Sequence, residues 1–134
     1  MFSNAAEAMF EADEATRSLG IALSEFGDGR AVASMRVTEA MVNGHAIAHG
    51  GFVFALADSA FALACNSHGP VTVAAGCDIT FVAPARLGDV LVAEAVERAV
   101  FGRSGLTDVS VRVLGSGALV AELRGRSRTA GPTP

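Results

Sequence analysis

The sequence predicts an α+β fold in which a strongly curved antiparallel sheet wraps around one long apolar helix, preceded by a short N-terminal helix. Residues 50–67 form an apolar run with a single charge, so their helix is hydrophobic on every side and must be covered all round. From residue 71 onward, strand-like runs alternate with turns that contain Gly or Pro. A curved sheet is therefore the cover that this chain offers the helix.

The segment before the apolar helix predicts a helix, a hairpin and a loop. Asn4-Ala-Ala-Glu7 has the form of a capping box, and the helix-prone run that follows it ends near Leu19-Gly20. The strand-like residues 21–26 and 31–37 flank two glycines, which supply the positive φ angles of a tight turn. Residues 38–49 are small and polar, and they predict a loop leading into the helix.

The segment after the apolar helix predicts four strands joined as an antiparallel meander. A chain of 134 residues fits one domain with a real core. We expect that domain to span residues 1–128 and residues 129–134 to be a disordered tail. The four expected strands are residues 71–82, 90–100, 106–114 and 118–126.

Composition restricts the classes of function. Apolar residues make up 51% of the chain and charged residues 18%, which is little charge for a small monomer and predicts a homo-oligomer. The formal charge is −4 and no basic cluster carries interleaved aromatics, so nucleic acid is not an expected partner. The two cysteines lie in apolar surroundings and predict free thiols rather than a disulfide framework or a zinc site.

No segment predicts an association with a membrane. The first positively charged residue is Arg17, so the N-terminus lacks the basic segment of a secretory leader. Residues 50–65 are apolar but too short to cross a bilayer, and Asp58 interrupts them. We therefore predict a cytoplasmic protein.

Asp58 is the first candidate functional residue. A carboxylate among residues that favour burial is costly unless it is paired or used in chemistry. It is predicted to act as a nucleophile or general base, with a structural carboxylate capped by N–H or Arg groups as the alternative. Ala55, Ala62 and Cys65 share its helix face and leave room beside it for a ligand.

Gly50 and Gly51 are the second candidate feature, because they open the predicted helix. Their N–H groups have no partner inside the helix and lie at its positive end, where they can stabilise a developing oxyanion. The alternative is that two glycines merely permit a tight turn. Eight residues of helix separate Gly50 from Asp58 by about 12 Å. A site shared between two subunits would bring the two groups together, so we predict a site at a dimer interface.

Other polar residues near the helix start are candidates for supporting roles. His45 and His49 have helical spacing, but no third ligand is evident, so no metal site is predicted. His49 is expected to position the loop or a substrate carbonyl, and the Asn43 amide to orient a water or a carbonyl. His68 is expected to mark the helix end. No G-x-S-x-G, G-x-G-x-x-G or P-loop pattern occurs, which disfavours serine hydrolase and nucleotide-binding folds.

A set of short motifs distributed over most of the chain carries a family resemblance. The motifs are Asn43-Gly-His45, His49-Gly-Gly51, Leu56-Ala-Asp58, Ala64-Cys-Asn66, Pro84, Gly88-Asp89, Gly102-Arg-Ser-Gly105 and Arg124-Gly-Arg126. In order and spacing, from about Leu19 to Arg128, they resemble the hotdog-fold acyl-CoA thioesterases of the phenylacetate-degradation (PaaI) type. The interval from His-Gly-Gly to Asp58 is the usual one in that family.

The resemblance implies a hotdog domain that pairs into a dimer with a continuous sheet, and further into a tetramer. It implies hydrolysis of a coenzyme A thioester without a metal or redox cofactor. Gly50 would polarise the thioester carbonyl through its N–H, and Asp58 of the other subunit would attack it or activate water. His49 and Asn43 would be the supporting polar groups.

The resemblance also implies contacts with the coenzyme A portion of the substrate. Gly51 and the turn containing Arg103, Ser104 and Gly105 would contact the substrate, with the turn near its pantetheine and nucleotide end. Arg86 and Arg126 are further phosphate candidates, for which ordinary surface arginine is the alternative.

One departure from the family pattern concerns the group that holds water. Ala62 stands where relatives with a different nucleophile carry a hydroxyl.

Four phenylalanines could line an aryl pocket or belong to the core, and these are Phe52, Phe54, Phe61 and Phe81. The leading hypothesis is a thioesterase acting on aryl or hydroxyphenylacetyl thioesters of coenzyme A. The alternatives are a hotdog hydratase or dehydratase and a non-catalytic acyl-CoA-binding protein.

Overall fold

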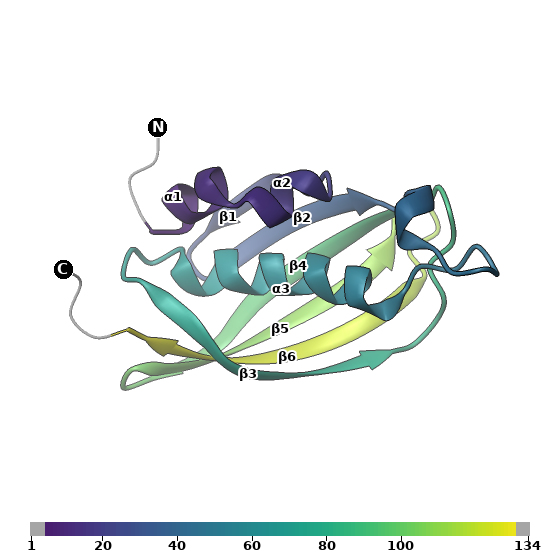
Figure 1. Cartoon of the computed structure of the whole chain (residues 1–134). Helices are drawn as coiled ribbons and strands as arrows, with labels where there is room; N and C mark the ends of the chain where they lie inside the picture. Colours follow the sequence, from purple (N-terminus) through teal and green to yellow (C-terminus); the bar gives the residue numbers. More distant parts are fainter. Residues whose placement is uncertain (1–4, 131–134) are drawn as a thin grey trace.

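The computed structural model describes residues 5–130 and shows one six-stranded antiparallel sheet curved around a central helix (Figure 1). This is the predicted α+β architecture. The central helix, α3, spans Gly50–Asn66, and the strand order in the sheet is β1-β2-β4-β5-β6-β3. The strands are β1 (Ala22–Gly27), β2 (Arg30–Arg36), β3 (Thr72–Phe81), β4 (Val90–Phe101), β5 (Ser104–Val113) and β6 (Leu119–Thr129).

The predicted meander is wrong for one strand. β3 does not lie beside β4 but pairs with β6 at the edge of the sheet. The chain then crosses the end of the sheet and begins β4 beside β2. The N–H of Val37 donates to the carbonyl of Asp89 and the N–H of Gly88 donates to that of Val37, which holds this junction. A connection of this length permits either a hairpin or a crossover, so spacing in the sequence does not distinguish them.

The single N-terminal helix that the sequence predicts is two helices in the structure. α1 spans Ala5–Ala12 and α2 spans Glu14–Ser18. The break falls at Asp13, whose extended backbone caps α2 and whose side chain accepts the N–H of Thr16 at 2.9 Å. The capping box predicted at Asn4 lies outside the described residues.

The last strand is longer than predicted. β6 continues to Thr129, which the sequence analysis assigned to the disordered tail. The N–H of Thr129 donates to the carbonyl of Arg103, and the N–H of Ala130 donates to that of Val71. These bonds extend the sheet past Arg128, while residues 131–134 lie outside the described part of the chain.

The core lies between α3 and the concave face of the sheet. Phe61 is completely buried there, and its ring packs on Gly125 of β6. A Cβ atom at position 125 would lie 2.6 Å from that ring, so only glycine permits this contact. Phe61 is therefore a core residue, which removes it from the candidates for an aryl pocket. The other fully buried residues of α3 are Leu56, Ala57, Ala60, Leu63 and Ala64.

The opposite side of α3 is covered by the two N-terminal helices. Figure 1 shows α3 lying between α1 and α2 on one side and strands β5 and β6 on the other. The face of α3 that carries Ala55, Asp58, Ser59 and Ala62 is only half-buried. These side chains are therefore partly accessible, whereas the residues of α3 that face the sheet are fully packed.

Candidate active site

Asp58 lies in the middle of α3 on its half-buried face. Among residues 5–130 its carboxylate has no hydrogen-bond or ion-pair partner, so the alternative of a structural carboxylate capped by N–H or Arg groups gains no support. Burial raises the pKa of Asp58 above its usual range, and the negative charge of Asp13 raises that pKa further. A half-buried carboxylate of this kind is suited to proton transfer or attack on a carbon.

The N-terminal end of α3 presents free hydrogen-bond donors. His49 is the N-cap, with an extended backbone and no hydrogen bond from its side chain to the helix. Within the described residues, the N–H groups of Gly50 and Gly51 have no acceptor. Gly51 is exposed, whereas the ring of Phe81 covers Gly50 so closely that a Cβ there would lie 2.8 Å from it. These donors form a site that can receive a partial negative charge.

The loop before α3 is held by Asn43. Its side-chain oxygen accepts the N–H of His45 at 2.8 Å and the N–H of Ile47 at 3.2 Å. The backbone N–H of His49 donates to the carbonyl of Met41, which belongs to the short 3₁₀ helix Glu39–Met41. Asn43 is therefore a positioning residue for the loop that delivers His49 to the helix start, and its amide nitrogen remains available to a ligand.

The structure gathers some of the predicted site residues and separates others. Asn43, His49, Gly50 and Gly51 all lie at the N-terminal end of α3. Asp58 lies eight residues further along the same helix, roughly 12 Å away along its axis. Within one subunit, Asp58 and the free donors therefore cannot meet at one reacting atom.

The predicted coenzyme A contacts fall in three places. Arg103, Ser104 and Gly105 line one cavity of about 310 Å³, together with the end of β6. Arg126 borders a neighbouring cavity of about 200 Å³ and donates to Asp78 on β3. Arg86 lies apart from both, beside the loop of His49, because it pairs with Ile47 in an isolated bridge.

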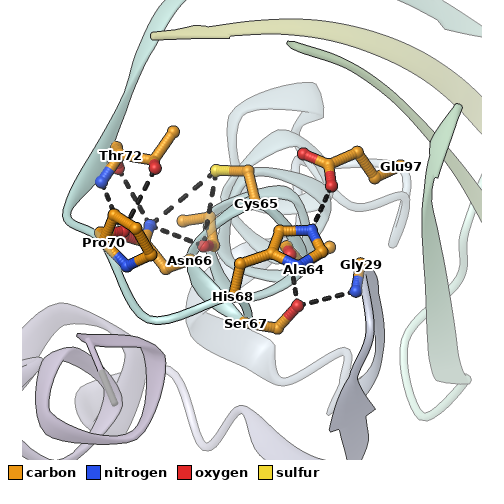
Figure 2. Close-up of polar contacts among 10 residues, drawn as sticks. Gly29, Ala64, Cys65, Asn66, Ser67, His68, Pro70, Thr72 and Glu97 are labelled. Atoms are coloured by element: carbon orange, nitrogen blue, oxygen red, sulfur yellow. Dashed lines mark hydrogen bonds and ion pairs between the residues drawn. The ribbon is translucent and has the colours of Figure 1, made fainter. Parts of the chain in front are cut away.

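The C-terminal end of α3 carries a polar cluster that the sequence analysis missed (Figure 2). The buried side chain of Asn66 donates to the carbonyls of Ala62 and Thr72, and it accepts the N–H of Thr72. The ring of His68 is hydrogen-bonded to Glu97, whose side chain is only 7% exposed. A signal for Glu97 was present, since it continues the inward-facing series of β4 in which Leu91, Ala93 and Ala95 are buried.

A second missed feature joins the N-terminal helices to α3. The hydroxyl of Thr16 donates to Asp13 at 2.6 Å and lies 3.1 Å from the hydroxyl of Ser59. Ser59 directly follows Asp58 on α3. No sequence pattern indicates this link, because the three residues belong to two elements far apart in the chain.

The described residues bring no three His, Cys, Asp or Glu side chains together as a group of metal ligands. Cys65 and Cys77 are free thiols, as predicted. Burial raises the pKa of Cys65 to about 12, with smaller contributions from the charges of Glu97 and Asp58. No helix in residues 5–130 is long and apolar enough to cross a membrane.

The structure thus combines a sheet curved around a helix, a carboxylate without a partner in the described residues, and free N–H groups at the start of that helix. The family described as the thioesterase superfamily matches residues 45–119. The chain belongs to this superfamily, and its predicted class, a thioester-hydrolysing enzyme with a hotdog fold, is confirmed.

Two similar proteins are named as acyl-coenzyme A thioesterases. The chain is 43% identical over 128 residues to acyl-coenzyme A thioesterase PaaI of Escherichia coli K12, covering 96% of this chain and 91% of that protein. It is 31% identical over 121 residues to human acyl-coenzyme A thioesterase 13, covering 88% and 86% of the two chains.

Two solved structures are similar to this chain in both fold and sequence. The structure of E. coli PaaI, from the phenylacetic acid degradation operon, matches with a TM-score of 0.92 at 42% identity, covering 96% of this chain and 92% of that one. The TT0310 protein of Thermus thermophilus matches with a TM-score of 0.82 at 38% identity, covering 87% and 97%. The predicted resemblance to the PaaI type is therefore confirmed.

Proposed function

We propose that this protein hydrolyses acyl-CoA thioesters to a free acid and coenzyme A, at sites shared between two subunits. The observation that carries the proposal is the separation of two reactive features on one helix. Asp58 is partnerless within residues 5–130, and the free donors at Gly50 and Gly51 lie roughly 12 Å away from it. Each feature is half of a thioesterase site, and a second subunit supplies the other half.

The edge strand β3 offers the means of pairing. It is hydrogen-bonded to β6 along one side only, and Val71, Val73 and Phe81 on or beside it are about half exposed. An open apolar edge is suited to pairing with another strand. The occupant we propose is β3 of a second copy, running antiparallel, which gives a dimer with a continuous sheet.

Antiparallel pairing would bring opposite ends of the two β3 strands together. Phe81 at the end of β3 packs on Gly50, whereas Thr72 at its start is bonded to Asn66 at the end of α3. The start of one α3 would then lie alongside the α3 of its partner, whose middle carries Asp58 on a half-buried face. This arrangement supports the composite site. A further association of two dimers into a tetramer is part of the same proposal.

The proposed chemistry uses these groups in separate roles. The N–H of Gly50 donates to the thioester carbonyl oxygen, which gains negative charge as the tetrahedral intermediate forms. The ionised carboxylate of Asp58 either attacks the carbonyl carbon or takes a proton from the attacking water. The C–S bond then breaks and coenzyme A leaves as a thiol after gaining a proton. Where Asp58 is the nucleophile, the acyl group remains on it as an anhydride, and water hydrolyses this anhydride to release the free acid and restore the carboxylate. His49, held by the loop that Asn43 orders, borders the carbonyl.

The substrate we propose is an aryl or hydroxyphenylacetyl thioester. Support comes from the similarity to PaaI of the phenylacetic acid degradation operon and from the partly exposed Phe52, Phe54 and Phe81. The cavity lined by Arg103, Ser104 and Gly105 is open to the pantetheine arm, and Arg126 beside it to a phosphate. Arg86 is the weakest phosphate candidate, since it lies apart from these residues.

The test is thiol release from a panel of aryl-, arylacetyl- and straight-chain acyl-CoA esters. We expect the wild type to release thiol fastest from an arylacetyl ester, and Asp58→Asn to lower kcat by at least about a hundredfold. Asp28→Asn is the matched control, because Asp28 is exposed in the β1–β2 turn and Asn tolerates its positive φ of 51°.

Three outcomes would contradict the proposal in different ways. No thiol release by the wild type would favour a binding protein. A change in acyl unsaturation with the thioester intact would favour a hydratase. Equal activity of wild type and Asp58→Asn, with the same oligomeric state by light scattering, would remove Asp58 from the mechanism.

A further inference from the structure

The chain of side chains Asp13, Thr16 and Ser59 has a role in the fold that the proposed mechanism does not use. Thr16 is 3% exposed and directs its backbone N–H and its hydroxyl to the two carboxylate oxygens of Asp13, at 2.9 and 2.6 Å. The same hydroxyl lies 3.1 Å from that of Ser59 on α3. Both oxygens of Asp13 are therefore held by Thr16, which itself contacts the helix that carries Asp58.

The N-terminal helices are thereby fixed against α3 beside Ser59. Both α1 and α2 contact α3, and Figure 1 shows them along its length. The hydroxyl of Thr16, which is buried, contacts the hydroxyl of Ser59, which is half-buried. Because Ser59 directly follows Asp58 on α3, this contact determines which part of the N-terminal segment lies near Asp58. The part it presents is Asp13, which is negatively charged.

The surroundings of Asp58 contain no compensating cation within residues 5–130. The charged group that acts on it is Asp13, from the junction of α1 and α2. Two thiols lie within range of its charge, Cys77 on the edge strand β3 and Cys65 on α3 itself. Neither thiol is charged at neutral pH, since burial raises the pKa of both. Within residues 5–130 of one chain, Asp13 is thus the charged group that acts on Asp58.

We propose that Asp13 is a positioning residue for the reaction: held by Thr16, whose hydroxyl contacts Ser59 on α3, it keeps its carboxylate near Asp58 and so influences the pH at which the enzyme becomes active. This inference rests on the proposed role of Asp58 as the reacting carboxylate. It adds a residue from a part of the chain that the predicted catalytic set does not include.

The sign of the effect follows from charge repulsion. A carboxylate near another carboxylate loses its proton at a higher pH, because two negative charges repel. The acid limb of the pH–rate profile, where Asp58 becomes ionised, therefore lies at higher pH with Asp13 present than without it. A carboxylate of raised pKa is also a stronger base, so the plateau rate above that limb is higher with Asp13 present.

Asp13→Asn is the variant that tests this. Asn is as good an N-cap as Asp, and its side chain can still bond to Thr16, so the helix start and the link to Ser59 are kept while the charge is lost. Asp13→Ser is a second neutral cap, used in case the amide packs poorly. Glu14→Gln is the matched control, because Glu14 is the next residue, is exposed and pairs with Arg17 away from α3.

The measurement is kcat and KM for one aryl-CoA ester from pH 4 to 9, on the intact oligomer of each variant. We expect the acid limb of kcat to move to lower pH in Asp13→Asn and Asp13→Ser. On that limb kcat, expressed as a fraction of each variant's own plateau, should be at least about twofold above the wild type, which corresponds to about 0.3 pH unit. KM should be unchanged, and Glu14→Gln should follow the wild-type profile.

Two results would overturn the inference without touching the proposed function. One is a profile of both Asp13 variants that superimposes on the wild type. The other is a uniform loss of kcat at every pH with the same midpoint, since that would make Asp13 a purely structural cap. Asp58→Asn is measured alongside: if it stays active, the proposed function fails and this inference falls with it.

Discussion

The two ends of helix α3 differ in how their polar groups are satisfied. At the N-terminal end, the N–H groups of Gly50 and Gly51 have no acceptor in the described residues and the His49 side chain caps nothing. At the C-terminal end, the Asn66 side chain is hydrogen-bonded to Ala62, Cys65 and Thr72. The Ser67 hydroxyl donates to Ala64 and accepts the N–H of Gly29. One end holds the fold together, while the other is left open to a ligand.

This difference shows that the two ends of α3 serve stability and function separately. Unpaired polar groups cost free energy unless something binds them, and here they gather at the end of the helix that carries the family motif. The tied end fixes the start of the edge strand β3, because two of the Asn66 bonds go to Thr72. Changes at the open end should therefore affect catalysis, and changes at the tied end should affect unfolding.

The largest effect is expected from deleting one donor at the open end. Gly50→Pro removes the N–H at the first helical position, where proline is tolerated, and the extended backbone of His49 suits a residue before proline. The proline ring would collide with Phe81, so the variant is made together with Phe81→Ala. We expect kcat to fall about 10²- to 10³-fold in a thiol-release assay.

The matched control for this experiment is Gly50→Ala in the same Phe81→Ala background. It carries the same Cβ atom but keeps the N–H, so the difference between the two variants isolates the donor. Equal kcat values for the alanine and proline variants would show that the Gly50 N–H does not bind the carbonyl oxygen.

A smaller effect, on stability alone, is expected at the tied end. Asn66→Ala removes a buried amide and leaves the backbone groups of Thr72 without their partners. The free energy of unfolding should fall by roughly 1–3 kcal/mol in urea denaturation, with kcat of the folded enzyme within about twofold of wild type. Ser116→Ala removes an exposed hydrogen bond to Ala118 and should change stability by less than about 0.5 kcal/mol. A large loss of kcat without loss of stability would contradict the division between the two ends.

The open end of α3 could be predicted from the sequence because its signals are local. The run of apolar residues predicted the helix to within one residue of its observed end, and Gly-Gly at its start predicted free donors. Asp58 stood out as one charge among apolar neighbours. Each of these features lies within a single stretch of chain, where periodicity and capping rules apply.

The tied end and the N-terminal link could not be predicted, because their partners come from distant elements. Glu97 meets His68 only because β4 lies beside the end of α3, and Thr16 meets Ser59 only because α2 packs on that helix. The edge position of β3 likewise depends on which strand it pairs with in the folded sheet, and that strand is β6. Pairings of this kind are set by packing across the core, which no spacing in the sequence records.

The smallest effect is expected from Asp58 itself, as a change in stability that depends on pH. Burial raises its pKa in the folded state, so the neutral form is favoured there. The folded state therefore gains free energy of unfolding from the neutral carboxyl of Asp58. This contribution is fully present below the usual pKa of a carboxyl and is lost as pH rises through the raised pKa. Asp58→Asn stays neutral and should have a higher Tm than the wild type at pH 7, and the same Tm once the acid is protonated. Differential scanning calorimetry between pH 4 and 8 measures this, and a Tm difference that grows towards acid pH would have the wrong sign. The half-buried site that makes Asp58 reactive would then also make it a cost to the fold at the pH where it works.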